Sequence, residues 1–301
     1  MTMLRKGEWW LLAAVDDGGQ GSVYFGCDDS GRPAAIKVPK RLNEQGPQGE
    51  RRQRREPAVL LSLDHEGIVK QLGHGSDYLA MEYIAGPSLD LAIHRPLYRQ
   101  RYLGDDRRLA AVFMKIAQAF RYLHGREVVH RDLKPRNVGF RPNGDPVLFD
   151  FGLARSTSDS ASTVMRIGTM AYWAPEQDLP PKNGFKLQEW MKIDVYQFGA
   201  TLFEAVTRKS PAREADSTDS PFGDGEHRRG PGHSDPRRSP RTRGADVTSG
   251  CFLGSLIRAC IHEDPQKRPD WGEIIGVLEA AQAGGRRRPR PASQLAVPSL
   301  Y

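Results

Sequence analysis

Residues 130–137 read His-Arg-Asp-Leu-Lys-Pro-Arg-Asn, and residues 150–152 read Asp-Phe-Gly. Between them, apolar side chains alternate around the turn sequence Pro-Asn-Gly-Asp at 142–145, a pattern typical of a β-hairpin. Such a hairpin would bring Asp150 back beside Asn137 and Asp132. Two carboxylates and an amide in one cluster suit a site in which one carboxylate holds a nucleophile and two groups bind Mg²⁺.

Strand patterns dominate the part of the chain that precedes this cluster. Alternating apolar residues predict strands over 9–40 and 68–84, and apolar residues at helical spacing predict a helix over 47–63. We therefore expect a small β-rich lobe with one main helix at 8–84.

The following part, at 85–282, is predicted to be a larger and mainly helical lobe. Asp270 followed by Glu273 is a capping box, which marks the start of a helix. Apolar spacing predicts the remaining helices, at 109–123, 193–206 and 252–261.

Two segments have too few large apolar residues to offset chain entropy on folding. Residues 210–249 are rich in Ser, Pro, Gly, Arg and Asp, and we predict a disordered insertion there. Residues 283–301 form a basic tail rich in Pro and Arg. The hydrophobic content of 38% across the 301 residues agrees with partial disorder.

The formal charge of +7 arises largely from runs of arginine. No aromatic residues interleave these runs as a base-stacking surface would need, which disfavours nucleic acid as a partner. The sequence has neither an apolar run long enough to span a membrane nor a secretory signal, so we expect a soluble, cytoplasmic protein. Cys27, Cys251 and Cys260 form no CxxC pair and are expected to be reduced thiols.

The string at 130–137 followed by Asp-Phe-Gly resembles the eukaryotic-type (Hanks-type) protein kinases. The resemblance implies an α+β bilobal kinase fold, with ATP as the cofactor and Mg²⁺, or alternatively Mn²⁺, as the metal. It implies that Asp132 accepts the hydrogen bond of the substrate hydroxyl and that Lys134 neutralises the moving phosphoryl group. Asn137 and Asp150 would hold the metal.

Further matches give the branch of the family and two structural residues. Lys134, together with Gly-Thr at 168–169 before Ala-Pro-Glu at 174–176, resembles the Ser/Thr-specific branch. In that branch the residue at Thr169 hydrogen-bonds the catalytic aspartate and lysine. Asp194 matches the buried residue that braces the catalytic loop, and Arg268 matches the partner of the glutamate in Ala-Pro-Glu.

The nucleotide-binding residues are implied on weaker sequence signals. Residues 18–23 read Gly-Gly-Gln-Gly-Ser-Val, which taken alone favours a plain hairpin turn, and Asp16 replaces the family's first glycine. Lys37 ends a strand that resembles the family's V-A-I-K. The implied set is Val15, Gly18, Gly19, Gly21, Val23, Ala35, Lys37, Glu56, Met81, Glu82 and Ile84.

Two departures from the family pattern lie in this region. Glu56 is the implied partner of Lys37, but Pro57 follows it, so the helix is either kinked or begins at Pro57. Gly139 stands where a leucine usually floors the adenine pocket. We predict a thinner floor and weaker nucleotide affinity.

Arg131 suggests regulation, because in family members with this arginine a phosphate on the activation segment often pairs with it. The alternative is a Ser-rich loop without that role. We favour autophosphorylation at Ser162 or Thr163 among the candidates Ser156, Thr157, Ser158, Ser160, Ser162 and Thr163.

The sequence thus predicts a serine/threonine protein kinase that acts on Ser or Thr hydroxyls of protein substrates. A pseudokinase or scaffold is the alternative, motivated by Asp16, Pro57 and Gly139. A small-molecule phosphotransferase is disfavoured by Ala-Pro-Glu and the Arg268 match. The physiological substrate and the oligomeric state stay open.

Overall fold

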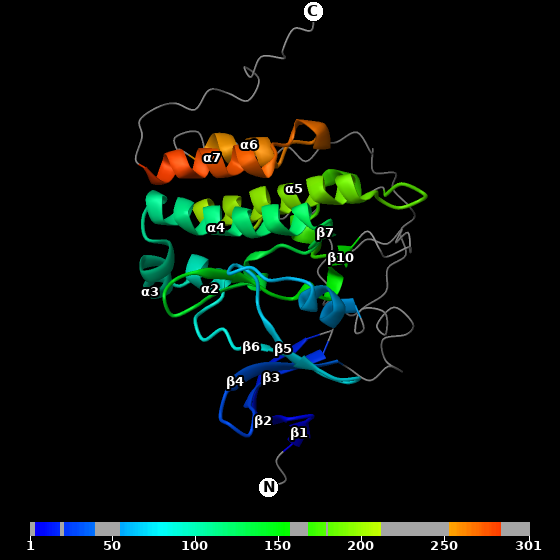
Figure 1. Ribbon diagram of the computed structural model, residues 1–301. Coiled ribbons are helices and arrows are strands. Elements are labelled where there is room, and N and C mark those ends of the chain that lie inside the picture. The colour runs from blue at the N-terminus through cyan, green and yellow to red at the C-terminus, as the bar shows by residue number, and fades with distance from the viewer. Residues whose placement is uncertain are drawn as a thin grey trace, which may run out of the picture.

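The computed structural model describes residues 4–18, 21–39, 55–156, 168–178, 180–211 and 253–283. A β-sheet at the N-terminal end and a group of helices at the C-terminal end form two lobes (Figure 1). This arrangement confirms the expected α+β bilobal fold. Nearly all of the predicted insertion and tail lie outside the described residues, as do Cys251 and residues 157–167.

The N-terminal lobe contains a six-stranded antiparallel sheet in the order β1-β2-β3-β4-β6-β5. Its strands are β1 (Leu4–Lys6), β2 (Trp9–Gly18), β3 (Gly21–Cys27), β4 (Pro33–Pro39), β5 (Gln71–His74) and β6 (Leu79–Glu82). On one face Trp9, Ala34, Ile36 and Ala80 form a buried apolar cluster. Because side chains alternate along β4, Lys37 lies on the opposite face from Ile36.

The helix of this lobe is described over residues 55–61, the C-terminal part of the range predicted for it. Arg55 and Glu56 are already helical, so Pro57 is not the first residue of the helix. Val59 and Leu60 are buried in the main apolar core, which attaches this segment to the rest of the protein.

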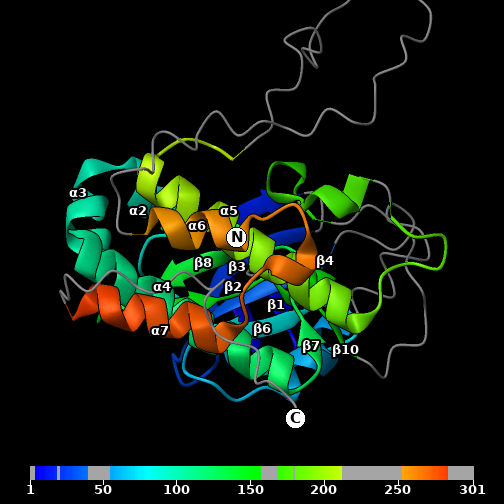
Figure 2. The ribbon, with the colours of Figure 1, turned by 90° about the horizontal axis from the view of Figure 1, so that it is seen from above.

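The C-terminal lobe is built on two long helices, α4 (Asp106–Gly125) and α5 (Leu187–Thr207). Seen from above, α7 (Trp271–Gln282) lies along α4, and α6 (Gly254–Cys260) lies along α5 (Figure 2). Shorter elements precede α4, namely α2 (Leu89–His94), α3 (Pro96–Tyr98) and the π-helical turn η1 (Arg99–Leu103). No helix among the described residues is both long and apolar enough to cross a membrane.

Caps and apolar periodicity explain where these helices form. The carboxylate of Asp105 accepts a hydrogen bond from the backbone N–H of Arg108 and caps α4. The predicted capping box of Asp270 and Glu273 is confirmed at the start of α7. Helix α5 begins earlier than predicted because Glu189 accepts from the backbone N–H of Lys186 and extends it by nearly two turns.

Aromatic rings fill the space between the long helices. The ring of Phe113 meets that of Phe198 edge-on at 5.5 Å between centroids. Trp271 of α7 stacks on Phe120 of α4 at 5.2 Å and meets Phe198 of α5 at 5.5 Å. The loop 130–137 packs on this aromatic core, since the ring of His130 lies beside that of Phe120.

The predicted hairpin is confirmed, with β8 (Val138–Phe140) antiparallel to β9 (Pro146–Leu148). A second small sheet pairs β7 (Val128–Val129) with β10 (Arg155–Ser156). Short 3₁₀ turns complete the lobe: η2 (Pro135–Asn137), η3 (Phe151–Leu153), η4 (Met170–Tyr172), η5 (Pro175–Asp178) and η7 (Pro265–Lys267).

Candidate active site

The loop 130–137 is held from below by Asp194 of α5, which is fully buried. Its Oδ2 accepts from the backbone N–H of His130 at 3.0 Å, and its Oδ1 accepts from the backbone N–H of Arg131 at 2.8 Å. Arg131 has a φ of +69°, a left-handed conformation that costs about 1–2 kcal/mol for a residue with a side chain. The two hydrogen bonds offset that strain and fix the direction of the loop.

Gln197 of α5 is a second support, and the sequence analysis missed it. Its Oε1 accepts from the backbone N–H of Leu133 at 3.0 Å, and its Nε2 donates to the carbonyl of Arg131 at 3.2 Å. Gln197 lies three residues after Asp194 and therefore on the same side of the helix. That spacing was the signal that could have identified it.

The side chains of the loop meet in a polar cluster around Asp132, a residue that is only 3% exposed. Oδ2 of Asp132 accepts from Lys134 Nζ at 2.9 Å and from Asn137 Nδ2 at 3.2 Å. Oδ1 accepts from the backbone N–H of Thr169 at 2.8 Å and from its hydroxyl at 3.1 Å. The structure thus brings together all four residues that were predicted as catalytic.

Lys37 connects the two lobes. Its Nζ lies 2.8 Å from Oε2 of Glu56 in the N-terminal lobe and 2.9 Å from Oδ1 of Asp150 in the C-terminal lobe. Burial disfavours the charge on Lys37, but the two carboxylates outweigh that effect and raise its pKa above the usual value. The ammonium group of Lys37 therefore stays charged at neutral pH.

Asp150 lies at the end of the β8–β9 hairpin, beside Asn137. The backbone N–H of Phe149 donates to the carbonyl of Asn137 at 3.1 Å, and Asp150 itself has a φ of +62°. Burial raises the pKa of Asp150, but the nearby Lys37 charge outweighs it and the net shift is downward. The carboxylate of Asp150 is therefore ionised, as a ligand of a cation must be.

The donor set of these two residues fits a divalent cation. The amide nitrogen of Asn137 donates to the backbone carbonyl of Asp132 at 2.8 Å, so it is the amide oxygen that remains for a metal. An amide oxygen with a carboxylate is the kind of hard oxygen pair that Mg²⁺ prefers.

The remaining predicted residues line the sheet above this cluster. Gly18 pairs with Gly21 where β2 turns into β3, and Val23 pairs with Lys37. Gly19 lies outside the described residues. Val15 is on β2 and is 56% exposed, so it is open to a ligand.

The segment that joins the lobes carries the other predicted residues. Met81 of β6 is buried and pairs with Ala35 of β4. The carboxylate of Glu82 receives two hydrogen bonds from Arg141 of the C-terminal lobe, at 2.7 and 2.9 Å. Ile84 lies two residues after Glu82 and against Gly139.

Arg131 and Arg268 are both buried, but their settings differ. The guanidinium of Arg268 holds both carboxylate oxygens of Glu176, at 2.7 and 2.8 Å, which anchors the segment 174–176 as the sequence match implied. The guanidinium of Arg131 lies 5.0 Å from the centroid of the Trp190 ring, and its Nε donates to the carbonyl of Leu153. The candidate phosphorylation sites at 157–163 lie outside the described residues, and of Ser156 only the backbone is described.

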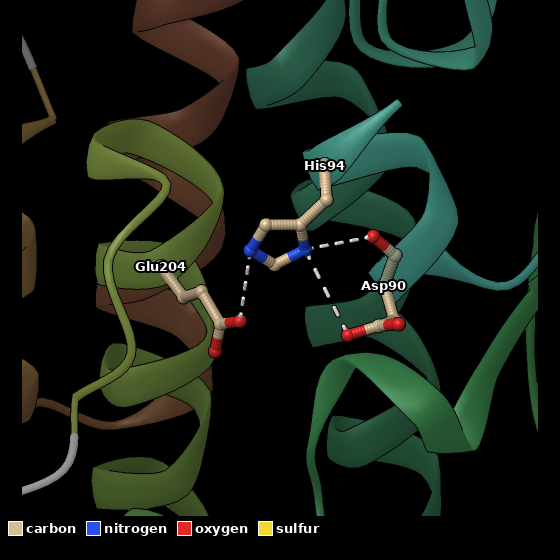
Figure 3. A group of neighbouring side chains, drawn as sticks. All are labelled: Asp90, His94 and Glu204. Carbon is tan, nitrogen blue, oxygen red and sulfur yellow. Dashed lines mark hydrogen bonds and ion pairs between the residues drawn. The ribbon is translucent and has the colours of Figure 1, made fainter. Parts of the chain in front are cut away.

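A further polar cluster, which the sequence analysis missed, lies beside this site. The ring of His94 on α2 lies between Asp90 of the same helix and Glu204 of α5 (Figure 3). Its Nδ1 is 3.8 Å from Oδ1 of Asp90, and its Nε2 is 3.7 Å from Oε1 of Glu204. The hydroxyl of Tyr172 donates to the other oxygen of Glu204, so the cluster ties the segment after Thr169 to α2 and α5.

Comparison with known proteins agrees with this geometry. The family model described as "Protein kinase domain" matches residues 11–277. A probable serine/threonine-protein kinase of Streptomyces coelicolor is 33% identical over 68% of this chain, which corresponds to 31% of that protein. Cysteine-rich receptor-like protein kinase 6 of Arabidopsis thaliana is 30% identical over 88% of this chain and 40% of its own length.

A third relative is a putative mitogen-activated protein kinase kinase kinase 7-like protein of Drosophila melanogaster. It is 32% identical over 73% of this chain and 53% of its own length. The chain thus spans between about a third and about half of the length of these relatives. The family match covers most of the chain, and it includes most of both lobes and the polar cluster around Asp132. The chain therefore belongs to the protein kinase family.

Proposed function

We propose that this protein is an active serine/threonine protein kinase, which transfers the γ-phosphate of ATP to Ser or Thr hydroxyls of protein substrates. The observation that supports this most is the pair of carboxylates in two different settings. Asp132 is surrounded by hydrogen-bond donors, while Asp150 pairs with Lys37. One carboxylate can orient a hydroxyl, and the other can bind a cation.

Asp132 would accept the hydrogen bond of the incoming hydroxyl and take its proton late in the transfer. Thr169 and Asn137 orient its carboxylate through their hydrogen bonds. The ammonium group of Lys134 lies 2.9 Å from the same carboxylate, where it can neutralise charge on the phosphoryl group.

Asn137 and Asp150 would hold a divalent cation, for which we propose Mg²⁺ with Mn²⁺ as an alternative. When bound, such an ion would neutralise charge on the phosphates of the nucleotide. Lys37, positioned by Glu56, would contact the α- and β-phosphates. The residues that we propose around the rest of ATP are Val15, Gly18, Gly19, Gly21, Val23, Ala35, Met81, Glu82 and Ile84.

Specificity for Ser and Thr is supported by the contact of Lys134 Nζ with the Thr169 hydroxyl at 2.8 Å and by the names of the relatives. We further propose that the kinase lobes have the boundaries 8–84 and 85–282, and that the protein works in the cytoplasm, where ATP is supplied. Autophosphorylation at Ser162 or Thr163 is part of the same proposal.

The test is transfer of labelled phosphate from Mg-ATP to a generic basic protein. We expect transfer by the wild type and a loss of at least about 100-fold in Asp132→Asn, because a positioned acid–base group contributes that much. Mass spectrometry of the incubated protein should find phosphate at Ser162 or Thr163.

Transfer that is equally absent in wild type and Asp132→Asn, in protein that still binds ADP, would overturn the proposal and favour a scaffold role. The departures at Asp16, Pro57 and Gly139 are the observations that favour this second function.

A further inference from the structure

One face of the β8–β9 hairpin lacks a side chain at its centre. Gly139 lies directly opposite Val147 in the register of the two strands. Phe149 is two residues after Val147 and therefore projects from the same face. The aromatic ring of Phe149 is thus a diagonal neighbour of the glycine.

The space that a side chain at Gly139 would take is already occupied. A Cβ atom at this position would lie 3.0 Å from Cε1 of Phe149 and 2.9 Å from Cγ2 of Ile84. Ordinary van der Waals contacts between carbon atoms are about 3.5–4.0 Å. The two side chains therefore close over the glycine.

Phe149 is held in this position by its backbone. Its N–H donates to the carbonyl of Asn137 at 3.1 Å, and its carbonyl lies 3.3 Å from Nε2 of His130. Its ring is half-buried and packs against the main core. Such a ring presents a fixed apolar surface to whatever lies above the hairpin.

The two residues are also linked along the chain to the two ends of the proposed nucleotide site. Ile84 follows β6 in the segment that joins the lobes. Phe149 directly precedes Asp150, whose carboxylate binds Lys37 on the phosphate side. A purine that lies between these ends must rest on the Gly139 face of the hairpin.

We propose that Phe149, together with Ile84, forms the floor of the adenine site and that Phe149 replaces the side chain missing at Gly139. This inference rests on the proposed function and identifies Phe149 as a residue that determines nucleotide affinity. It also replaces the thin floor predicted from sequence with an aromatic one. Gly139 is then required, since a side chain there would displace the ring.

The first experiment measures the Kd of Mg-ADP by calorimetry. Stacking of a base on an aromatic side chain is worth about 1–3 kcal/mol by alanine substitution, so Phe149→Ala should raise the Kd by about 5-fold or more. Phe149→Leu keeps apolar volume but loses the ring, so its Kd should lie between those of the wild type and Phe149→Ala. Phe185→Leu is the matched control, because Phe185 is half-buried against Trp190 in a different apolar cluster from the one that Phe149 joins.

A double-mutant cycle tests whether a side chain at position 139 and the Phe149 ring compete for the same space. Gly139→Leu alone should weaken binding, because the new side chain meets the Phe149 ring. In the Phe149→Ala background the same Gly139→Leu substitution should weaken binding less, because the new side chain no longer meets the ring and contacts only Ile84. Equal effects of Gly139→Leu in both backgrounds would overturn the inference.

A spectroscopic readout separates stacking from a general loss of structure. The adenine H2 or H8 proton of bound ADP should show a ring-current shift in the NMR spectrum, which Phe149→Leu abolishes and Phe185→Leu preserves. If the wild type binds ADP and Phe149→Ala binds it equally well, the assignment of Phe149 to the floor of the adenine site is wrong, while the proposed function stands. If the wild type binds no ADP, the proposed function itself is overturned, and the floor with it.

Discussion

The loop 130–137 and the Lys37–Glu56 pair face each other across the candidate site, but they are supported in different ways. Backbone N–H groups of the loop donate hydrogen bonds to Asp194 and Gln197, which are fully buried on one long helix. Lys37 of β4 is held instead by two carboxylates, Glu56 in the segment 55–61 and Asp150 in the C-terminal lobe. The first region is therefore supported from one helix, whereas the position of Lys37 depends on carboxylates of both lobes.

This difference separates the effects expected from mutation. Loss of a loop support leaves buried backbone N–H groups without an acceptor, which costs stability as well as activity. Loss of Glu56 leaves Lys37 with Asp150, so the fold keeps a partner for the buried charge while the position of Lys37 changes. Substitutions at the two regions should therefore differ in how far they lower the free energy of unfolding.

Asp194→Asn should cause the largest loss. The amide keeps one acceptor oxygen and turns its N–H₂ group towards a backbone donor, so we expect the free energy of unfolding to fall by about 3 kcal/mol. Urea unfolding followed by circular dichroism measures it. Asp105→Asn is the matched control, because asparagine caps a helix as well as aspartate does. An Asp194→Asn protein as stable as the wild type would contradict the argument.

Glu56→Gln should affect activity more than stability. Glutamine can still accept a hydrogen bond from Lys37 but no longer neutralises its charge, so the ammonium group should shift towards Asp150. A misplacement of about 1 Å at such a site can cost about 100-fold, and we expect kcat/KM to fall by 10- to 100-fold. The unfolding free energy should fall by about 2 kcal/mol at most. A stability loss that exceeds that of Asp194→Asn would reverse the comparison.

Glu82→Gln should have a smaller effect that depends on pH. Hydrogen bonds from Arg141 outweigh burial and lower the pKa of Glu82 in the folded state. The stabilisation is therefore complete above the unfolded pKa of about 4.3 and is lost as pH falls through the lower folded value. We expect the free energy of unfolding of the wild type to exceed that of the variant by about 1 kcal/mol at pH 7. The gap should narrow below about pH 4, and a gap that is constant down to pH 2 would contradict this sign.

Pro57→Ala should have the smallest effect. Proline costs most where it removes a helical hydrogen bond, but within the first turn of a helix its missing N–H has no helical partner in any case. If Pro57 lies in the first turn, we expect a change in unfolding free energy below about 1 kcal/mol and little change in kcat/KM. A marked gain in kcat/KM would show that proline holds Glu56 away from its best position.

Much of the fold and site could be predicted because the signals are local. The capping box at Asp270 and the hairpin after Asn137 depend on residues within one turn or one pair of strands. The family resemblance supplied the distant pairs, such as Arg268 with Glu176. Pro57 is the instructive failure, since the sequence left open whether the helix starts there, and the structure shows Glu56 already helical.

The residues that the sequence analysis missed depend on contacts between distant elements. Gln197 supports the loop only because α5 presents it on the same side as Asp194. Glu204 meets His94 and Tyr172 only where α2 and α5 lie together. No local pattern in the sequence marks such a meeting of three segments.

The sequence by itself determined the family, the two-lobed fold and the acidic, basic and amide side chains of the loop 130–137. These depend on contiguous residues with fixed spacing. Tertiary structure alone decided how Lys37 is shared between Glu56 and Asp150, and what fills the space beside Gly139. Both depend on side chains brought together across the boundary of two lobes, where close packing leaves room for only one arrangement.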